Sequence, residues 1–297
     1  MTVLADNKAP KLNDKRFNHY VNLSLAGGES NMFFKTDETA PDVTSMPGCD
    51  AMFMFSYEIR KSWLFFGLGA QADYDYTWQK VGEFSDDFKR TDREAEPVIY
   101  GYHFSDYRDR QHNLQLSVPL YIGANLGRHA YVFAGAKVSI SFLAIHHTTT
   151  MLSTDGTYVR FIHTIKDAPT YGYYAADEYT YTAPFDASLK VSPLAEAGVR
   201  IPVKSKSGRV GMRLGAYAEY GIPLSWNNQM DLVDYRLVDK NPHTQNQQQL
   251  RSSIVFNSVI NAAFRQNPLS QLSAGLRWTV LFNITPPEHI CMCDADF

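Results

Sequence analysis

Residues 64–78 alternate without a break between two kinds of side chain. One face runs from Leu64 to Trp78 and is wholly apolar or aromatic, whereas the other, apart from Phe65, carries glycine, glutamine, threonine, Asp73 and Asp75. Successive strand residues point to opposite sides of a sheet, so this segment is expected to be a two-faced strand. Globular strands usually have about five or six residues, so the length suits a tilted strand that crosses a bilayer.

Seven further segments share this alternation, which predicts eight strands in all. The predicted strands are 19–27, 51–60, 64–78, 113–124, 130–144, 188–203, 209–221 and 271–282. Short connections (61–63, 125–129 and 203–208) alternate with long ones (28–50, 79–112, 145–187 and 222–270). This is the layout of an outer-membrane barrel, because a soluble β-sandwich has no reason to keep all its long loops at one end. No run of eighteen apolar residues offers a helical span instead.

The sequence therefore predicts an all-β protein, an eight-stranded antiparallel up-and-down transmembrane β-barrel with long extracellular loops. The barrel is expected to occupy residues 17–282, between periplasmic segments 1–16 and 283–297. The segment 252–265 leaves one alternative open. Its helical spacing of apolar residues fits a short helix over the barrel mouth, but an added hairpin there would give ten strands.

Alternation alone does not say which face points inward. In a soluble lipid-binding barrel the apolar face would line a cavity and the charged face would meet water. The charged face is rich in glycine and mixed in sign, which favours a packed interior and an apolar face toward lipid. Aromatic residues near the strand ends are expected to form membrane-interface belts: Trp63, Tyr76, Trp78, Phe142, Tyr220, Trp278 and Phe282.

Eight strands enclose an interior that side chains can fill, so buried charges there must be paired. A Glu196–Arg213–Arg277 cluster is expected, joined by Glu58 and Lys137. Asp73 is expected to face the same lumen near its outer mouth. The network is interpreted as a structural plug, with a gated ion or proton path as the alternative.

Two prolines fit poorly into a closed barrel. Pro119 and Pro193 lie within predicted strands, yet proline has no N–H to give to a ladder. Each is expected at a bulge or beside an unpaired carbonyl.

The loops are the expected functional surface, since loops on a rigid scaffold usually carry binding. A tyrosine-rich part of the third loop is the candidate partner-binding surface: Tyr171, Tyr173, Tyr174, Tyr179 and Tyr181. Rigid tyrosines give large contact areas at low entropic cost. Packing of these tyrosines within the loop, or in a hairpin that extends the strands, is the alternative.

Catalytic and metal chemistry have only nominal candidates. A hydrolytic array could draw on Ser141, His146, His147, Asp155 and Asp186, and a soft-metal site on His289, Cys291, Cys293 and Asp294. A triad is recognised by geometry, and a Cys-X-Cys spacing does not define a zinc site. No catalytic residue, metal or cofactor is therefore expected. The near-neutral net charge of −3 gives no support for nucleic-acid binding.

These segments, short inner turns, long outer loops and mixed-charge lumen resemble the OmpA-like and OmpX-like outer-membrane barrels. The glycine-rich strands and tyrosine-rich loops are also similar in style to outer-membrane barrels of Bacteroidota. The resemblance implies a bacterial outer-membrane protein with both termini periplasmic, in contact with outer-membrane lipid and lipopolysaccharide. It implies an adhesion, structural or accessory role in a membrane complex, with a small pore or a lipid-modifying enzyme as alternatives. The first residues lack the apolar core of a secretory signal, so we expect that the signal has been removed.

Overall fold

The computed structural model describes residues 17–38, 40–91, 96–168, 173–187, 189–201, 203, 209–224, 230–235, 254–266 and 270–286. In chain order these residues form β1 (Phe17–Phe33), β2 (Val43–Lys61), β3 (Leu64–Val81), β4 (Phe84–Thr91), β5 (Pro97–Leu126), β6 (Ala130–Tyr158), β7 (His163–Lys166), β8 (Asp177–Pro184), β9 (Lys190–Ile201), β10 (Val210–Pro223), β11 (Val233–Tyr235), β12 (Ile254–Phe256), the 3-10 helix η2 (Val259–Asn261) and β13 (Ser270–Asn283). None of the helical structure in these ranges is long and apolar enough to span a membrane.

Eight of the strands close into a ring. The hydrogen-bonded order is β5, β3, β2, β1, β13, β10, β9 and β6, and β6 pairs again with β5. All of these pairings are antiparallel, so the prediction of an eight-stranded antiparallel ring is confirmed. Strands β11 and β12 pair only with each other in a separate small sheet and do not enlarge the ring.

The ring is apolar outside and polar inside. On β5, Leu116, Val118 and Ile122 point outward and are more than half exposed, whereas Gln115 and Ser117 point inward and are buried. The other ring strands alternate in the same sense. A soluble barrel would bury the apolar face, so this is the inverse of a soluble core.

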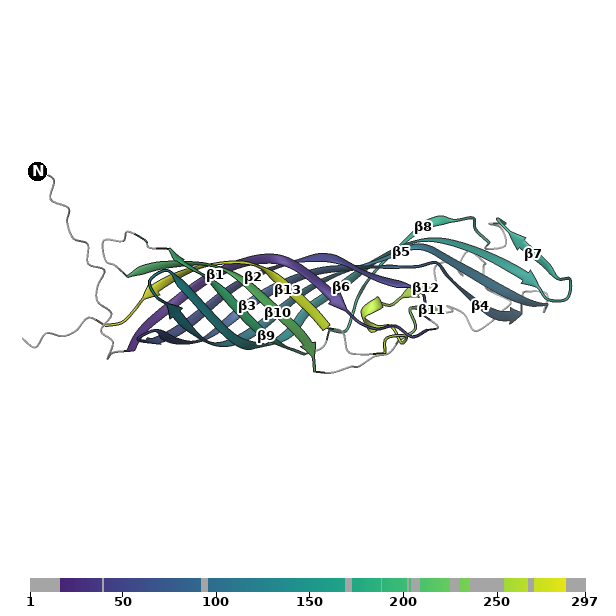
Figure 1. The fold of residues 1–297 in the computed structure, drawn as a ribbon. Coiled ribbons are helices and arrows are strands. Elements are labelled where there is room, and N and C mark those ends of the chain that lie inside the picture. Colours follow the sequence, from purple (N-terminus) through teal and green to yellow (C-terminus); the bar gives the residue numbers. More distant parts are fainter. Residues whose placement is uncertain are drawn as a thin grey trace, which may run out of the picture.

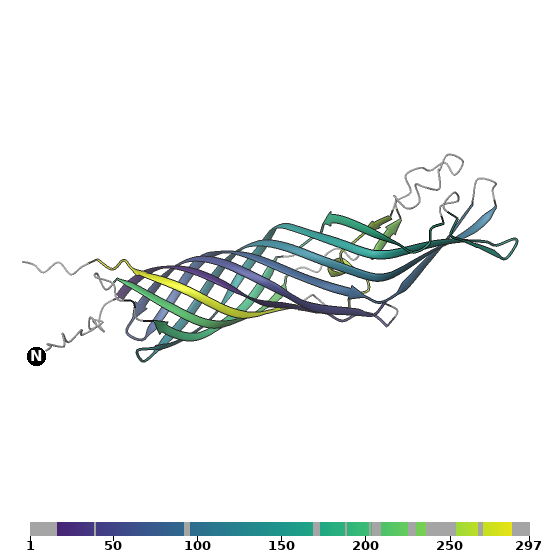
Figure 2. The ribbon, with the colours of Figure 1, turned by 90° about the horizontal axis from the view of Figure 1, so that it is seen from above.

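Three of the predicted long loops, 28–50, 79–112 and 145–187, are largely strand, which corrects the sequence interpretation. Strands β5 and β6 run far beyond the ring, carrying β4, β7 and β8 on their edges (Figures 1 and 2). We call this extension the distal sheet: β4, β7, β8, residues 97–105 of β5 and residues 145–158 of β6. It lies at the opposite end of the ring from the short turns that join β2 to β3 and β5 to β6.

The distal strands were missed because their environment changes along the chain. Within the ring the inward face of β5 is polar, but beyond it Tyr100, Tyr102, Phe104 and Tyr107 point inward and are buried. They pack in one core with Phe256 of β12, which comes from a distant part of the chain. In the distal part of β5, aromatic residues alternate with polar and charged ones. From the sequence alone, such a segment cannot be told from a loop, because the residues that cover its aromatic side are unknown.

The two prolines interrupt single ladders without shifting the register. The β3–β5 ladder has a gap opposite Pro119, and the β9–β10 ladder has one opposite Pro193. Pairing resumes in the same register on both sides of each gap. The missing N–H therefore leaves a local break in the ladder and creates no bulge.

Candidate functional site

Paired charges fill the lumen of the ring. Near the short turns, Glu58 is completely buried between Arg60 and Arg213. The Arg213 guanidinium donates hydrogen bonds to both carboxylate oxygens of Glu58, at 2.9 and 3.1 Å. Arg213 also lies over the Phe65 ring, 4.4 Å from its centroid. An unpaired buried charge costs several kcal/mol, so bidentate pairing is what makes this interior stable.

A second chain of ion pairs crosses the middle of the lumen. Lys137 Nζ lies 3.0 Å from Asp73 Oδ1 and 2.5 Å from Glu219 Oε2. Arg277 continues the chain, at 3.4 Å from the other oxygen of Glu219 and 3.1 Å from Glu196 Oε2. All five side chains are buried, so this chain of ion pairs lies in a packed part of the lumen.

The six predicted lumen residues all lie inside the ring, and Arg277 pairs with Glu196 as expected, but Arg213 does not join that pair. Arg213 bonds Glu58, not Glu196, and the bridging role belongs to Glu219. Cross-strand register explains the difference, because the residue opposite Arg213 is Arg200. Glu196 is four residues farther along β9, about 13 Å away along the strand.

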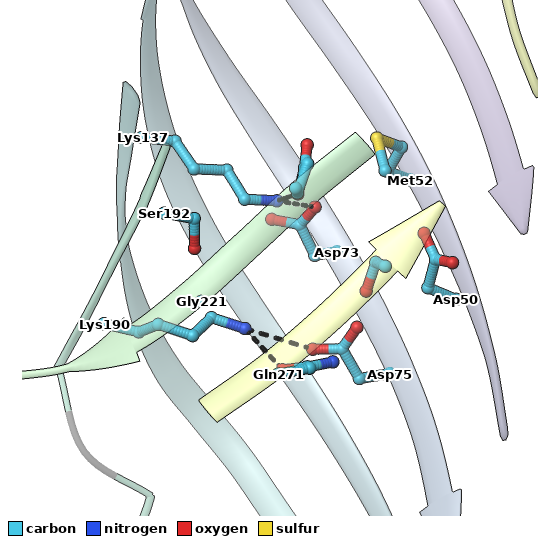
Figure 3. A pocket seen from close by; sticks show the side chains of 11 residues that line it. Asp50, Met52, Asp73, Asp75, Lys137, Lys190, Ser192, Gly221 and Gln271 are labelled. Carbon is cyan, nitrogen blue, oxygen red and sulfur yellow. Dashed lines mark hydrogen bonds and ion pairs between the residues drawn. The ribbon is translucent and has the colours of Figure 1, made fainter. Parts of the chain in front are cut away.

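A small polar cavity lies toward the distal end of the lumen (Figure 3). Lys190 Nζ reaches Gln271 Oε1 at 2.8 Å and Asp75 Oδ2 at 3.5 Å there, and Asp50 lies on the opposite side. The cavity has room for about one water molecule. The sequence did not single out Lys190, because its contact with Asp75 depends on strands that are far apart in the chain.

The distal mouth of the lumen is closed by a segment that we call the mouth cap, residues 230–235 and 254–266. Its anchor is Asp109 of β5, which is completely buried. The carboxylate accepts hydrogen bonds from Ser258 Oγ at 2.8 Å, the Val259 amide at 2.7 Å and Gln111 Nε2 at 2.6 Å, and it contacts His146 Nδ1 at 3.1 Å. These bonds place η2 over the lumen. This agrees with the interpretation of residues 252–265 as a short helix over the barrel mouth.

Above the cap, aromatic packing excludes water. Tyr107 is completely buried, and its ring lies 5.7 Å from that of Phe256. Burial raises the pKa of the Tyr107 phenol well above its ordinary value, and the nearby Asp109 carboxylate adds to this effect. The cap is therefore packed into the same apolar core as the distal sheet.

The tyrosine-rich segment does not form the exposed surface that was expected. Tyr173 is buried, and Tyr179 and Tyr181 lie 5.6 and 6.0 Å from the Phe256 ring in the same core. Tyr174 is partly buried. Tyr171 lies outside the described residues. Tyr179 and Tyr181 alternate inward on β8, so these two side chains and Tyr173 pack the distal sheet, as the alternative interpretation held.

The predicted interface aromatics lie on the outer face of the ring or at its edge. Five are exposed and two partly exposed: Trp63, Phe142, Tyr220, Trp278 and Phe282, then Tyr76 and Trp78. Trp278 does not lie where an aromatic residue of a membrane-interface belt is expected. It faces outward between Leu25 and Leu214, inside the apolar wall.

The nominal catalytic residues do not assemble, but a different array does. His146 contacts Asp109, and His147 bonds Thr182 on the outer face, so neither meets Asp155. Ser85, His103 and Asp155 instead lie on adjacent strands of the distal sheet. Ser85 Oγ is 2.8 Å from His103 Nδ1, and His103 Nε2 is 2.9 Å from Asp155 Oδ2.

This array has the order nucleophile, base and orienting carboxylate. With the ring proton on Nε2 held by Asp155, the Nδ1 lone pair of His103 accepts the Ser85 hydroxyl. Ser85 is exposed. Sequence reasoning missed this array, because cross-strand register alone brings the three residues together.

The turn between β6 and β7 forms an apolar tip. Phe161 and Ile162 are 64% and 89% exposed, and Val159 is also exposed. Ile162 has a φ of 49°, a left-handed conformation that is a true outlier for a β-branched residue. Arg160 beside it is paired with Glu96 at 2.8 Å. A strained, exposed apolar turn is typical of a contact site.

The candidate metal ligands of the tail, His289, Cys291, Cys293 and Asp294, lie outside the described residues, as do segment 1–16 and the last part of 283–297. Within the described ranges, no group of three or more histidine, cysteine, aspartate or glutamate side chains is placed to hold a metal ion.

Comparison with known proteins gives structural likeness only. No protein-family model matches the chain, and no curated protein sequence matches it. Among solved structures, it is similar to Ail, the attachment invasion locus protein of Yersinia pestis, at 7% identity and a TM-score of 0.25, over 88% of this chain and 97% of that one. Neisserial surface protein A is 10% identical, with a TM-score of 0.26, over 87% of this chain and 95% of that one. The outer membrane protease OmpT of Escherichia coli is 7% identical, with a TM-score of 0.27, over 91% of this chain and 97% of that one. The fold assignment rests on the strand pairings described above.

Proposed function

We propose that the protein is a sealed outer-membrane anchor that holds the distal sheet outside the cell for contact with a partner. The observation that carries this proposal is the ring itself, apolar outside, filled with ion pairs inside and capped at the end that bears the distal sheet. A water-filled pore needs an open interior, and a soluble lipid-binding barrel needs an apolar one. The buried and paired charges of this lumen favour the sealed anchor over both alternatives.

The outward face supports the membrane environment by its energetics. Each leucine, isoleucine or phenylalanine side chain gains roughly 1.5–3 kcal/mol when it leaves water. Such residues are exposed on the ring strands, for example Leu116, Ile122, Ile140, Phe142 and Leu276. A bilayer removes this surface from water without a protein partner. The long distal sheet then lies on the extracellular side, and both termini lie in the periplasm.

The apolar tip is the proposed contact surface. It lies at the end of the β6–β7 hairpin, where Phe161 and Ile162 are the most exposed large apolar side chains among the described residues. The tyrosines first expected to bind are committed to the distal core, so the tip takes their place in the proposal. Burying the tip against a partner would offset the cost of its exposure and of the Ile162 backbone.

Two measurements test the proposal. In planar bilayers the purified chain should give no steady conductance, and regular open-channel steps would overturn the sealed lumen. For the tip, a photo-crosslinking amino acid at Phe161 in intact producing cells should yield a discrete adduct. The same group at exposed Lys166 on the same hairpin should not. No adduct from Phe161, or equal adducts from both positions, would refute contact through the tip.

The geometry of Ser85, His103 and Asp155 favours a second candidate function, acyl transfer on the distal sheet. In this reaction Ser85 Oγ would bond to an acyl carbon and its proton would pass to His103 Nδ1. The bond from that carbon to the leaving group would then break as His103 gives the proton to the leaving group. Water would finally take the acyl group from Ser85, with His103 as the base. A fluorophosphonate probe should label the protein and lose the label in Ser85→Ala. The matched control is Ser153→Ala, on the other side of His103. Absence of labelling in the folded protein would remove this candidate.

A further inference from the structure

A patch of cationic and aromatic side chains lies on the outer face of the ring, just beyond the apolar rows. Cross-strand register places Trp78, Arg110 and His147 side by side on β3, β5 and β6. The next row toward the wall holds Tyr76 and His112. Arg110 and His147 are exposed, and the aromatic residues are partly exposed. With Tyr74 these residues form what we call the basic–aromatic patch.

Contacts within the patch fix its imidazole rings. Tyr74 Oη lies 2.7 Å from His112 Nδ1, and the Tyr76 ring centroid lies 5.1 Å from that of His112. The His147 ring stands edge-on to His112, with centroids 5.5 Å apart and an angle of 84°. Thr182 holds His147 Nδ1 at 2.7 Å. Both Nε2 atoms therefore remain available to a ligand.

The patch holds positive charge that the described residues do not neutralise. One row farther out, Asp106 pairs with Arg108 at 2.8 Å and approaches Lys80 at 4.0 Å. No carboxylate of the described residues forms an ion pair with Arg110, although Arg110 lies on the same strand and the same face as Arg108. A guanidinium without a counterion attracts an anion, so Arg110 is the group of the patch that favours anion binding.

The position of the patch narrows the kind of anion. The row immediately toward the ring holds Leu114 opposite Leu143, and the following row holds Leu116 opposite Ile140. All four side chains face outward, three of them exposed and Leu114 partly so. The patch therefore begins where the apolar wall ends, at the height of lipid headgroups. Aromatic side chains favour this interface, and arginine is well suited to bind phosphate through two hydrogen bonds.

We propose that the basic–aromatic patch binds a phosphate group of an outer-leaflet glycolipid. Arg110 is the principal anion-binding group, His112 and His147 add hydrogen bonds, and the Tyr76 and Trp78 rings pack against the sugar. The acyl chains lie along the wall below. This inference rests on the proposed function, because it requires that the ring spans the membrane with the distal sheet outside.

The test uses the full chain in lipid nanodiscs and two probes, bisphosphorylated lipid A and the same lipid A freed of phosphate. Binding is measured by titration with native mass spectrometry. The variants are Arg110→Gln and His147→Gln, with Arg108→Gln as the matched control, since Arg108 is neutralised by Asp106. Retained migration of unheated protein in SDS gels shows that each variant is folded and inserted.

The wild type should prefer phosphorylated lipid A by about tenfold or more, the size expected for a charge-assisted hydrogen-bonded contact. Arg110→Gln should remove most of this preference, His147→Gln should weaken it, and Arg108→Gln should keep it. An inserted wild type without preference, or equal losses in the Arg110 and Arg108 variants, would overturn the inference and leave the proposed anchor standing. A chain that does not insert at all would overturn both.

Discussion

Lys137→Met removes the only cation that the structure places between Asp73 and Glu219 in the described lumen. Lys137 is 4% exposed, and both carboxylates are buried with it. The variant keeps the volume of the side chain but leaves Asp73 without an ion-pair partner, while Glu219 retains Arg277. Breaking a buried ion pair at one partner costs roughly 3–5 kcal/mol, so the free energy of unfolding should fall by about that amount.

The assay is urea unfolding from lipid vesicles, followed by tryptophan fluorescence. Lys80→Met is the control, because Lys80 is half exposed and 4.0 Å from Asp106, and a surface pair is worth about 0–1 kcal/mol. Asp73→Asn combined with Lys137→Met removes both charges and should restore much of the loss. A Lys137→Met variant within about 1 kcal/mol of wild type, with an unchanged denaturant slope, would refute the reasoning.

Three further outcomes are expected. Asp109→Ala removes the carboxylate that accepts the hydrogen bond of the Val259 amide, so the mouth cap should loosen. Added protease should then cut the cap faster in the variant than in the wild type. Gly275→Ala should abolish refolding into vesicles, as judged by gel mobility, because its Cβ would lie 2.3 Å from the Gly27 carbonyl oxygen; a normally refolding variant would contradict this packing. Ile162→Gly should raise the free energy of unfolding by about 1 kcal/mol by relieving the positive φ, while the tip adduct is lost.

The wall of the ring was predictable from sequence because its two environments differ sharply. Residues such as Leu120 face outward and residues such as Ser117 face inward, so the period of two is visible in the residue types alone. The count of eight ring strands followed from this pattern and from the alternation of short and long connections. Gaps at Pro119 and Pro193 were foreseen for the same local reason, a missing N–H.

The lumen pairs and the distal sheet were not predictable in the same way. The partner of Arg213 depends on the offset between strands, which places Arg200 opposite it and brings Glu58 across the lumen. The inward tyrosines of β8 need Phe256 as their neighbour, and that residue lies far away in the chain. The Ser85–His103–Asp155 array likewise arises only from register.

The central claim is that the apolar face of the ring meets lipid and the charged face fills the lumen. Single cysteines on β5, in a background with Cys49, Cys291 and Cys293 replaced by serine, can carry a fluorophore that bromine-labelled lipid chains quench. Labels at Leu116, Val118, Leu120 and Ile122 should be strongly quenched. Labels at Ser117 and Tyr121 should be protected. The account would be contradicted if the labels at Ser117 and Tyr121 were quenched more strongly than those at the outward positions. It would also be contradicted if no label along β5 were quenched.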